Sequence, residues 1–178
     1  MAAPQSHVRV HQHDQTLTFV VEGRATMQQS PSVRRFAEQC LACQTIALGV
    51  DLRHCTHMDS TFLGTLLFLK RAVERQSQGI FMLISPSPQC CQLLQQMKLD
   101  EIFPIVTTDE LTASAWTELQ NEPEDLEAFK RNVVQAHQEL AHVEGPAGEI
   151  FRELAASLAK ELKAEKPEVG KTRTDGQA

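Results

Sequence analysis

Tyrosine is absent from this 178-residue sequence, and tryptophan occurs only once. Proteins that bind single-stranded nucleic acid stack the bases on aromatic side chains, so such a surface would be poorly supplied here. The formal net charge is −6, whereas proteins that bind the phosphate backbone of nucleic acids usually carry an excess of basic residues on their surface. We therefore expect no nucleic-acid partner, and a protein is the favoured class of partner.

Long hydrophobic runs are absent as well. The most apolar stretch, residues 62–69, is interrupted by Gly64 and Thr65, whereas a membrane-spanning helix needs roughly 18 or more apolar residues. The first residues show no basic segment followed by an apolar one, so no signal peptide is predicted. Five cysteines without disulfide-type spacing fit a reducing compartment. These features predict a cytoplasmic protein without a membrane partner.

Two groups of cysteine and histidine residues were considered as metal ligands. One is Cys40-x-x-Cys43, inside a predicted helix, and the other is His54, Cys55 and His57, in a predicted loop. A structural zinc ion takes four nitrogen or sulfur ligands, and no second Cys-x-x-Cys motif accompanies the first. We expect these residues to serve packing or solvent-facing roles, and we predict neither a metal nor another cofactor.

Catalysis is also not predicted. Ser60 lies close in sequence to His54 and His57, but no Gly-x-Ser-x-Gly nucleophile elbow and no candidate third group accompany them. A glycine-rich phosphate loop is missing too, so nucleotide binding by this chain is unsupported. We expect a protein that is not an enzyme.

Hydrophobic periodicity predicts an α/β fold in which strands alternate with helices. Period-two or continuous apolar runs predict strands near 7–11, 16–22, 45–52, 79–85 and 102–106. Helical spacing predicts helices that start at Ser30 and near Ser60, one through residues 90–97, and one more over 111–119. The order ββαβαβαβ predicts a mixed sheet of about five strands.

The composition changes after about Asp109. Asn121 is the predicted cap of a helix with an acidic first turn and an apolar stripe, and Gly145 and Pro146 separate this stripe from a second one. The two stripes predict a helical hairpin over residues 121–162. We expect residues 1–6 to be flexible, residues 7–120 to form the α/β domain, and residues 163–178 to be a disordered tail.

Asp59, Ser60 and Thr61 stand between a predicted strand and an apolar helical run. A hydroxyl residue at this place is a common helix N-cap, which predicts a capping role for Ser60. The positive end of the helix dipole would equally stabilise a phosphate there. From the local pattern alone, the cap is the favoured interpretation.

The segment Asp-Leu-Arg-(x)4-Met-Asp-Ser-Thr-Phe-Leu-Gly, residues 51–64, resembles the phosphorylation site of STAS-domain proteins, the anti-sigma factor antagonists and their relatives. The resemblance covers about residues 7–119 and includes residues 99–105. It implies a STAS fold with helices mainly on one side of the sheet. It also implies that Ser60 is a phosphoacceptor and that the partner is an anti-sigma factor or a related serine kinase.

Two residues depart from the family pattern. Phe62 replaces a glycine of many phosphorylated members, and it is either an exposed docking anchor or a core residue, with residue type favouring the core. Arg24 stands where antagonists commonly carry an acidic residue. With these departures, the resemblance places partner binding at Asp59, Ser60, Thr61, Phe62 and Arg24.

Two functions follow as hypotheses. The first is a regulatory switch, in which phosphorylation of Ser60 releases a bound anti-sigma factor or serine kinase. The second is a non-phosphorylated interaction or scaffold module that assembles, for example as a homo-oligomer, through residues 121–162. The apolar stripes of the hairpin would be buried on the α/β domain or on another copy of the chain.

Overall fold

The computed structural model describes residues 6–43, 45–109, 115–121 and 125–164. The strands in these ranges are β1 (His7–His13), β2 (Thr16–Ala25), β3 (Ala47–Asp51), β4 (Cys55–Met58), β5 (Ile80–Ile84), β6 (Ile105–Val106) and β7 (Thr117–Glu118). The helices are α1 (Ser30–Ala42), α2 (Ser60–Glu74), α3 (Pro88–Gln96), α4 (Leu126–Ala141) and α5 (Pro146–Ala164). The chain thus has the α/β architecture that the sequence predicts.

The described strands form a mixed sheet in the order β6-β5-β3-β2-β1-β7, and β4 pairs with the end of β2. The hairpin β1–β2 and the pair β1–β7 are antiparallel, whereas the pairs β2–β3, β3–β5, β5–β6 and β2–β4 are parallel. Because β4 pairs with the C-terminal end of β2, the turn after β4 brings Asp59 beside Ala25, and the Asp59 N–H donates to the Ala25 carbonyl at 3.0 Å.

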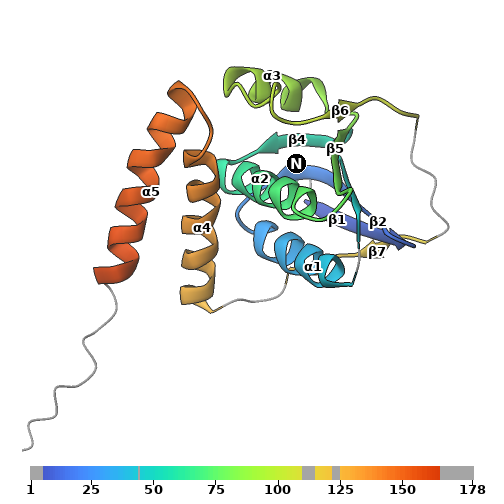
Figure 1. Cartoon of the computed structure of the whole chain (residues 1–178), viewed down its shortest axis with the longest axis horizontal. Coiled ribbons are helices and arrows are strands. Elements are labelled where there is room, and N and C mark those ends of the chain that lie inside the picture. The colour runs from blue at the N-terminus through green and yellow to red at the C-terminus, as the bar shows by residue number, and fades with distance from the viewer. Residues whose placement is uncertain (1–5, 44, 110–114, 122–124, 165–178) are drawn as a thin grey trace, which may run out of the picture.

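Helices α1 and α2 lie side by side over one face of the sheet, and α3 packs against β4 (Figure 1). The core between these layers is built from large apolar side chains that are fully buried, among them Phe19, Leu48, Leu66, Leu67 and Phe81. Helix α2 lies at the centre, because it contacts α1, β3 and β5. Its first turn, which carries Ser60, is therefore held on a rigid element.

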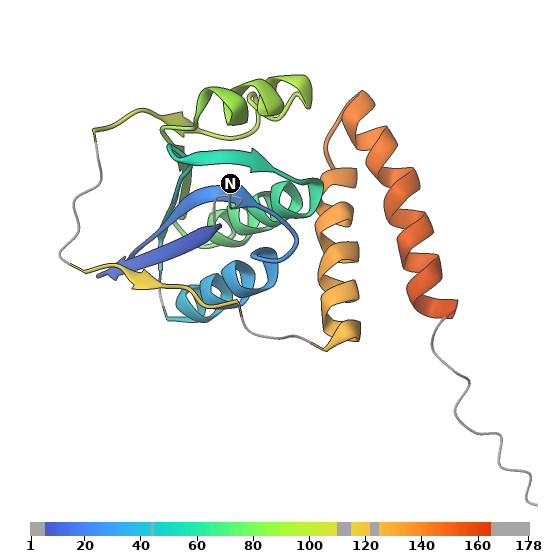
Figure 2. The ribbon, with the colours of Figure 1, turned by 180° about the vertical axis from the view of Figure 1, so that it is seen from behind.

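The C-terminal helices α4 and α5 form an antiparallel hairpin at one end of the molecule, as the view from behind also shows (Figure 2). Gly145, between them, has a φ of +90°, a conformation that residues with a side chain rarely adopt. Helix α4 packs on α2 rather than on the sheet, and α5 packs on α4. Leu140, Val143 and Phe151 join the hydrophobic core from this hairpin.

The structure differs from the sequence-based expectations at several places. The sheet has two strands more than the expected five, β4 and β7, and the second replaces the end of the helix predicted over 111–119. Residues 110–114, where that helix would begin, lie outside the described residues. Helix α4 begins at Leu126 with Asp125 as its cap, so Asn121 does not cap it.

The ends of the chain are described only in part. Of the predicted flexible segment 1–6, only Ser6 lies within the described residues, where its hydroxyl accepts from the Arg24 N–H at 3.2 Å. At the other end, residues 163–164 belong to α5 rather than to the predicted tail, and residues 165–178 lie outside the described part. Within that part, no helix has both the length and the apolar character that crossing a membrane requires.

Candidate functional site at the start of helix α2

The start of α2 is capped by Asp59, not by Ser60. Asp59 has an extended backbone (φ −91°, ψ 172°), and its Oδ1 accepts a hydrogen bond from the Phe62 N–H at 2.9 Å. Ser60 is the first helical residue, so the expectation that it caps the helix is wrong. Both residues are short and polar, but only the residue before the first helical turn can direct its side chain back to the free N–H groups.

The second carboxylate oxygen of Asp59 fixes the loop after β2. Oδ2 accepts from the Met27 N–H at 2.8 Å, and the Asp59 N–H is bound to Ala25. Arg24 precedes Ala25, is exposed, and pairs with His57 of β4 in the parallel register. Asp59 thus holds the end of β2, where Arg24 lies, next to the start of α2, where Ser60 lies.

Thr61 and Phe62 are buried. The Phe62 side chain is fully inaccessible within the core, and Thr61 is 4% exposed. Of the two alternatives for Phe62, the structure has the core residue, because an aromatic ring on the inner face of α2 is stabilised by leaving water. Thr61 and Phe62 therefore cannot contact a partner directly, in contrast to the sequence-based expectation for the site.

The Ser60 hydroxyl lies against His137 of helix α4. The distance between Ser60 Oγ and His137 Nε2 is 3.0 Å, and His137 Nδ1 lies 2.8 Å from the Val133 carbonyl oxygen. A carbonyl only accepts, so Nδ1 carries the proton in the neutral ring and Nε2 accepts from the Ser60 hydroxyl. The ring is 5% exposed and packs near Phe151, with ring centroids 6.0 Å apart.

The residues that the sequence offered as catalytic or metal-binding partners do not meet at Ser60. His54 and His57 are exposed, and the histidine that does bind Ser60 comes from a different segment. Cys40 is a buried residue of α1, while Cys43 is exposed. Across the part of the chain that the structure describes, no three His, Cys, Asp or Glu side chains are grouped as metal ligands.

Two buried cysteines, Cys55 of β4 and Cys90 of α3, lie where these two elements pack together. The Cys90 thiol and the Ser87 hydroxyl both donate to the Cys55 carbonyl, at 3.4 and 2.5 Å. The hydrogen bond with Cys90 and the burial of the thiol raise the pKa of Cys55 well above its usual value. Cys55 therefore stays a neutral thiol at physiological pH, which is the property of a packing residue rather than of a nucleophile.

His137 was missed by the sequence-based reasoning. It follows Val133 by four positions and precedes Leu140 by three, so it falls on the apolar stripe of α4. A histidine on an apolar stripe that becomes buried needs a hydrogen-bonding partner, so the sequence pattern does predict that His137 has one. The pattern does not predict the identity of the partner, because Ser60 lies 77 positions away in the sequence.

Comparison with protein families gives one match, to the family model described as "Mlab, STAS domain", over residues 8–107. The match covers more than half of the chain and contains Asp59 and Ser60. It ends before α4, so the helical hairpin lies outside it. No curated protein matches the chain.

Solved structures with a similar fold are anti-sigma factor antagonists. The unphosphorylated form of SpoIIAA has a TM-score of 0.53 at 17% identity, covering 58% of this chain and 89% of that one. The phosphorylated form from Bacillus has 0.50 at 17%, covering 58% and 92%. The antagonist from Mycobacterium paratuberculosis has 0.51 at 22%, covering 59% and 89%. At these identities, the likeness concerns the fold.

Proposed function

Because the chain belongs to the STAS domain family, we propose that it is a regulatory protein of the anti-sigma factor antagonist kind. In this proposal it binds an anti-sigma factor or a related serine kinase, and phosphorylation of Ser60 ends the binding. The partner kinase supplies ATP, and the chain itself performs no catalysis and needs no cofactor. The proposed place of action is the cytoplasm.

The observation that carries this proposal is the position of Ser60 in the first turn of α2. Since Asp59 is the cap, Ser60 has no capping role; the residue is partly exposed, and its hydroxyl instead hydrogen-bonds to His137 of α4. The N–H groups of the first turn have no intrahelical partner, and they carry the positive end of the helix dipole. Such a position accommodates a phosphate group without refolding the domain.

The proposed partner surface consists of Asp59, Ser60 and Arg24. Asp59 and Ser60 are partly exposed and Arg24 is exposed, whereas Thr61 and Phe62 act only as core residues that hold α2 in place. A phosphate on Ser60 adds a charge of about −1.5 to −2, which would repel acidic partner groups. The existence of solved unphosphorylated and phosphorylated forms of SpoIIAA fits a modification of this type in proteins with this fold.

The proposal is tested by incubating the purified chain with ATP and the anti-sigma serine kinases of its own organism. Intact mass should increase by one phosphate, and the Ser60→Ala variant should show no increase. The unmodified chain should bind the kinase, and Ser60→Asp should weaken the binding because it places a negative charge at the start of α2. Binding that is equal for the wild type and Ser60→Asp would contradict the proposal.

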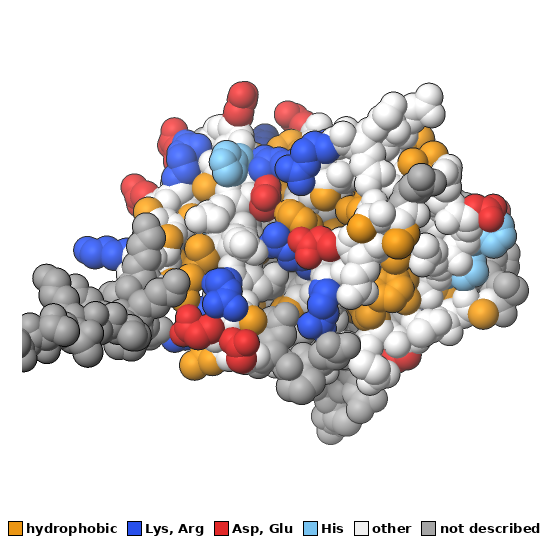
Figure 3. All heavy atoms as spheres, turned by 60° about the horizontal axis from the view of Figure 1, so that its bottom comes forward, with side chains coloured by type: hydrophobic (Ala, Val, Ile, Leu, Met, Phe, Trp, Pro, Cys, Tyr) orange, Lys and Arg blue, Asp and Glu red, His pale blue; other side chains and the backbone are white. Residues whose placement is uncertain are grey.

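The second candidate function is a scaffold module that assembles through α4 and α5. The observation in its favour is that Leu126 and Ile150, both on this hairpin, are 65% and 67% exposed. Figure 3 shows hydrophobic side chains between charged ones on the half of its face nearest the C-terminal residues. Between α4 and α5 lies a groove of about 230 Å³, which is lined mainly by apolar side chains that include Phe129 and Leu158.

Light scattering over a dilution series distinguishes the two candidates. The scaffold function requires a concentration-dependent oligomer that Ile150→Glu disrupts, since a charged side chain would be buried in the interface. A chain that stays monomeric in both forms would exclude assembly through this surface and would leave the regulatory function as the remaining candidate.

A further inference from the structure

The hairpin of α4 and α5 covers the end of α2 on which Ser60 lies. Helix α4 runs across this end in both ribbon views, with α5 on its outer side (Figures 1 and 2). The hairpin is not part of the sheet layers, and it begins after the matched family region has ended. It is therefore an addition to the domain, placed on the surface that the proposed function assigns to a partner.

The contact between the two helices is a backbone contact at Gly64. A methyl group added at Gly64 would lie 2.0 Å from the Ala136 carbonyl oxygen, and the three nearest heavy atoms around it all belong to Ala136. Such a distance is far below any real van der Waals contact, so α4 can occupy this position only while residue 64 is a glycine. Alanine would otherwise favour the helix, because it has a higher intrinsic helix propensity than glycine.

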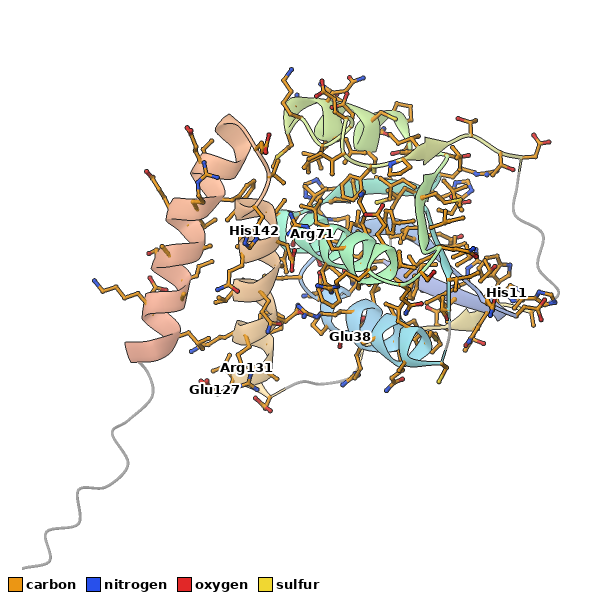
Figure 4. The ribbon with its side chains drawn as sticks, viewed as in Figure 1. His11, Glu38, Arg71, Glu127, Arg131 and His142 are labelled. Atoms are coloured by element: carbon orange, nitrogen blue, oxygen red, sulfur yellow. The ribbon has the colours of Figure 1, made fainter. Side chains whose placement is uncertain are left out.

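The contact continues to both sides of Gly64. Toward the start of α2, the buried His137 hydrogen-bonds to the hydroxyl of Ser60, which is partly exposed. One helical turn or more beyond Gly64, Arg71 forms an ion pair with Glu139. Figure 4 shows Arg71 and His142 together where α2 meets the end of α4. The hairpin is thus held on α2 by a hydrogen bond, a backbone contact and an ion pair, which are spread over most of the length of α2.

A phosphate on Ser60 does not fit under this seated hairpin. The modification replaces the proton that Ser60 donates to His137, and the phosphoryl group would occupy the space of the imidazole ring. The ring environment is apolar on one side, where Phe151 lies 6.0 Å away. A dianionic group beside these buried rings loses part of its hydration, so the phosphate opposes the seated hairpin.

We propose that α4 and α5 form an intramolecular cover over Ser60, which must leave before a kinase or partner reaches the start of α2, and which a phosphate on Ser60 keeps open. The regulatory role of this cover rests on the proposed function, whereas the opening of the hairpin can be measured on the chain alone. The occupant of the Ser60 surface in the resting protein is the chain's own helix α4, seated through Ser60, Gly64 and Arg71.

Hydrogen–deuterium exchange of the full chain tests the cover without any kinase. Gly64→Ala should open the hairpin by its methyl group, and Ser60→Asp should open it by its charge. In both variants, amides of α4 and α5 should exchange about tenfold faster or more, while amides of β3 and β5 keep their protection. Ser60→Ala is the matched control for Ser60→Asp: it removes the hydrogen bond to His137 but adds neither volume nor charge, so exchange of α4 and α5 should rise clearly less than in Ser60→Asp.

Unchanged exchange of α4 and α5 in both variants would overturn the cover. An equal loss of protection in the hairpin and in β3 and β5, seen in both variants, would overturn it as well, because the hairpin would then be an inseparable part of the core. Failure of the proposed function has a different signature. In that case the hairpin opens as described, but Ser60 is not phosphorylated by any kinase of the organism, even in Gly64→Ala.

Discussion

The backbone N–H of Met27 donates a hydrogen bond to Oδ2 of Asp59 at 2.8 Å, joining the loop after β2 to the start of α2. The other carboxylate oxygen of Asp59 caps the helix through Phe62. A single side chain therefore fixes both the loop that follows Arg24 and the turn that presents Ser60. The geometry of the candidate site depends on this residue more than on the serine itself.

We expect Asp59→Ala to lower the free energy of unfolding by about 1 to 3 kcal/mol, because it removes the cap and the bond to Met27 together. Asp59→Asn should lose less, since its single amide oxygen still accepts from Phe62 but its NH2 group cannot accept from Met27. Urea denaturation of both variants measures the difference. An alanine variant as stable as the wild type would show that Asp59 does not hold the site.

The hydrogen bond between Ser60 and His137 should appear as a coupling energy. A double-mutant cycle with Ser60→Ala and His137→Leu is expected to give about 0.5 to 1.5 kcal/mol, the usual net value of one intramolecular hydrogen bond. Ser60→Ala alone should cost less than Asp59→Ala, because Ser60 is not the cap. Strictly additive single variants would mean that the two side chains do not interact in solution.

Phe62 should behave as a core residue. Phe62→Ala is expected to destabilise the chain by about 3 to 5 kcal/mol, because it leaves a cavity where a fully buried ring was. Phe62→Leu keeps most of the volume and should cost clearly less. Thermal or urea unfolding gives both values, and an alanine variant that loses less than about 1 kcal/mol would place the ring outside the core.

The cysteines should differ in their reactivity toward alkylating reagents. Cys43 is exposed and should react in the folded protein, whereas Cys55 and Cys90 are 0% and 1% exposed. Because the pKa of Cys55 is raised, its thiolate, which is the reactive form, is also scarce. Mass spectrometry should find Cys55 and Cys90 modified only after denaturant is added, and their rapid modification without it would contradict this packing.

Much of the fold was predictable because its main strands and helices carry clear apolar periods. Leu17, Phe19 and Val21 alternate as a half-buried strand should, and the run before Leu52 is continuous as in a central strand. Strand β4 was missed since Thr56 and His57 are exposed and the segment reads as a polar loop. Strand β7 has only two residues, and its existence depends on pairing with β1.

The site was predictable only as far as its local sequence reaches. The segment from Asp59 to Phe62 indicated a helix start, but it did not decide which residue is the cap, since aspartate and serine both serve well there. The contact of His137 with Ser60 depends on how α4 packs on α2. That packing is set by backbone proximity at Gly64, which no periodic pattern records.

The central claim is that Ser60 is the phosphorylated residue of a STAS-domain switch. Its most direct test is phosphopeptide mapping of the chain purified from its native cell, with fragments that separate Ser60 from Thr61. We predict a phosphate on Ser60, in a fraction of the molecules that changes with growth conditions. A phosphate on Thr61 or at another position, with Ser60 unmodified under all conditions, would contradict the account.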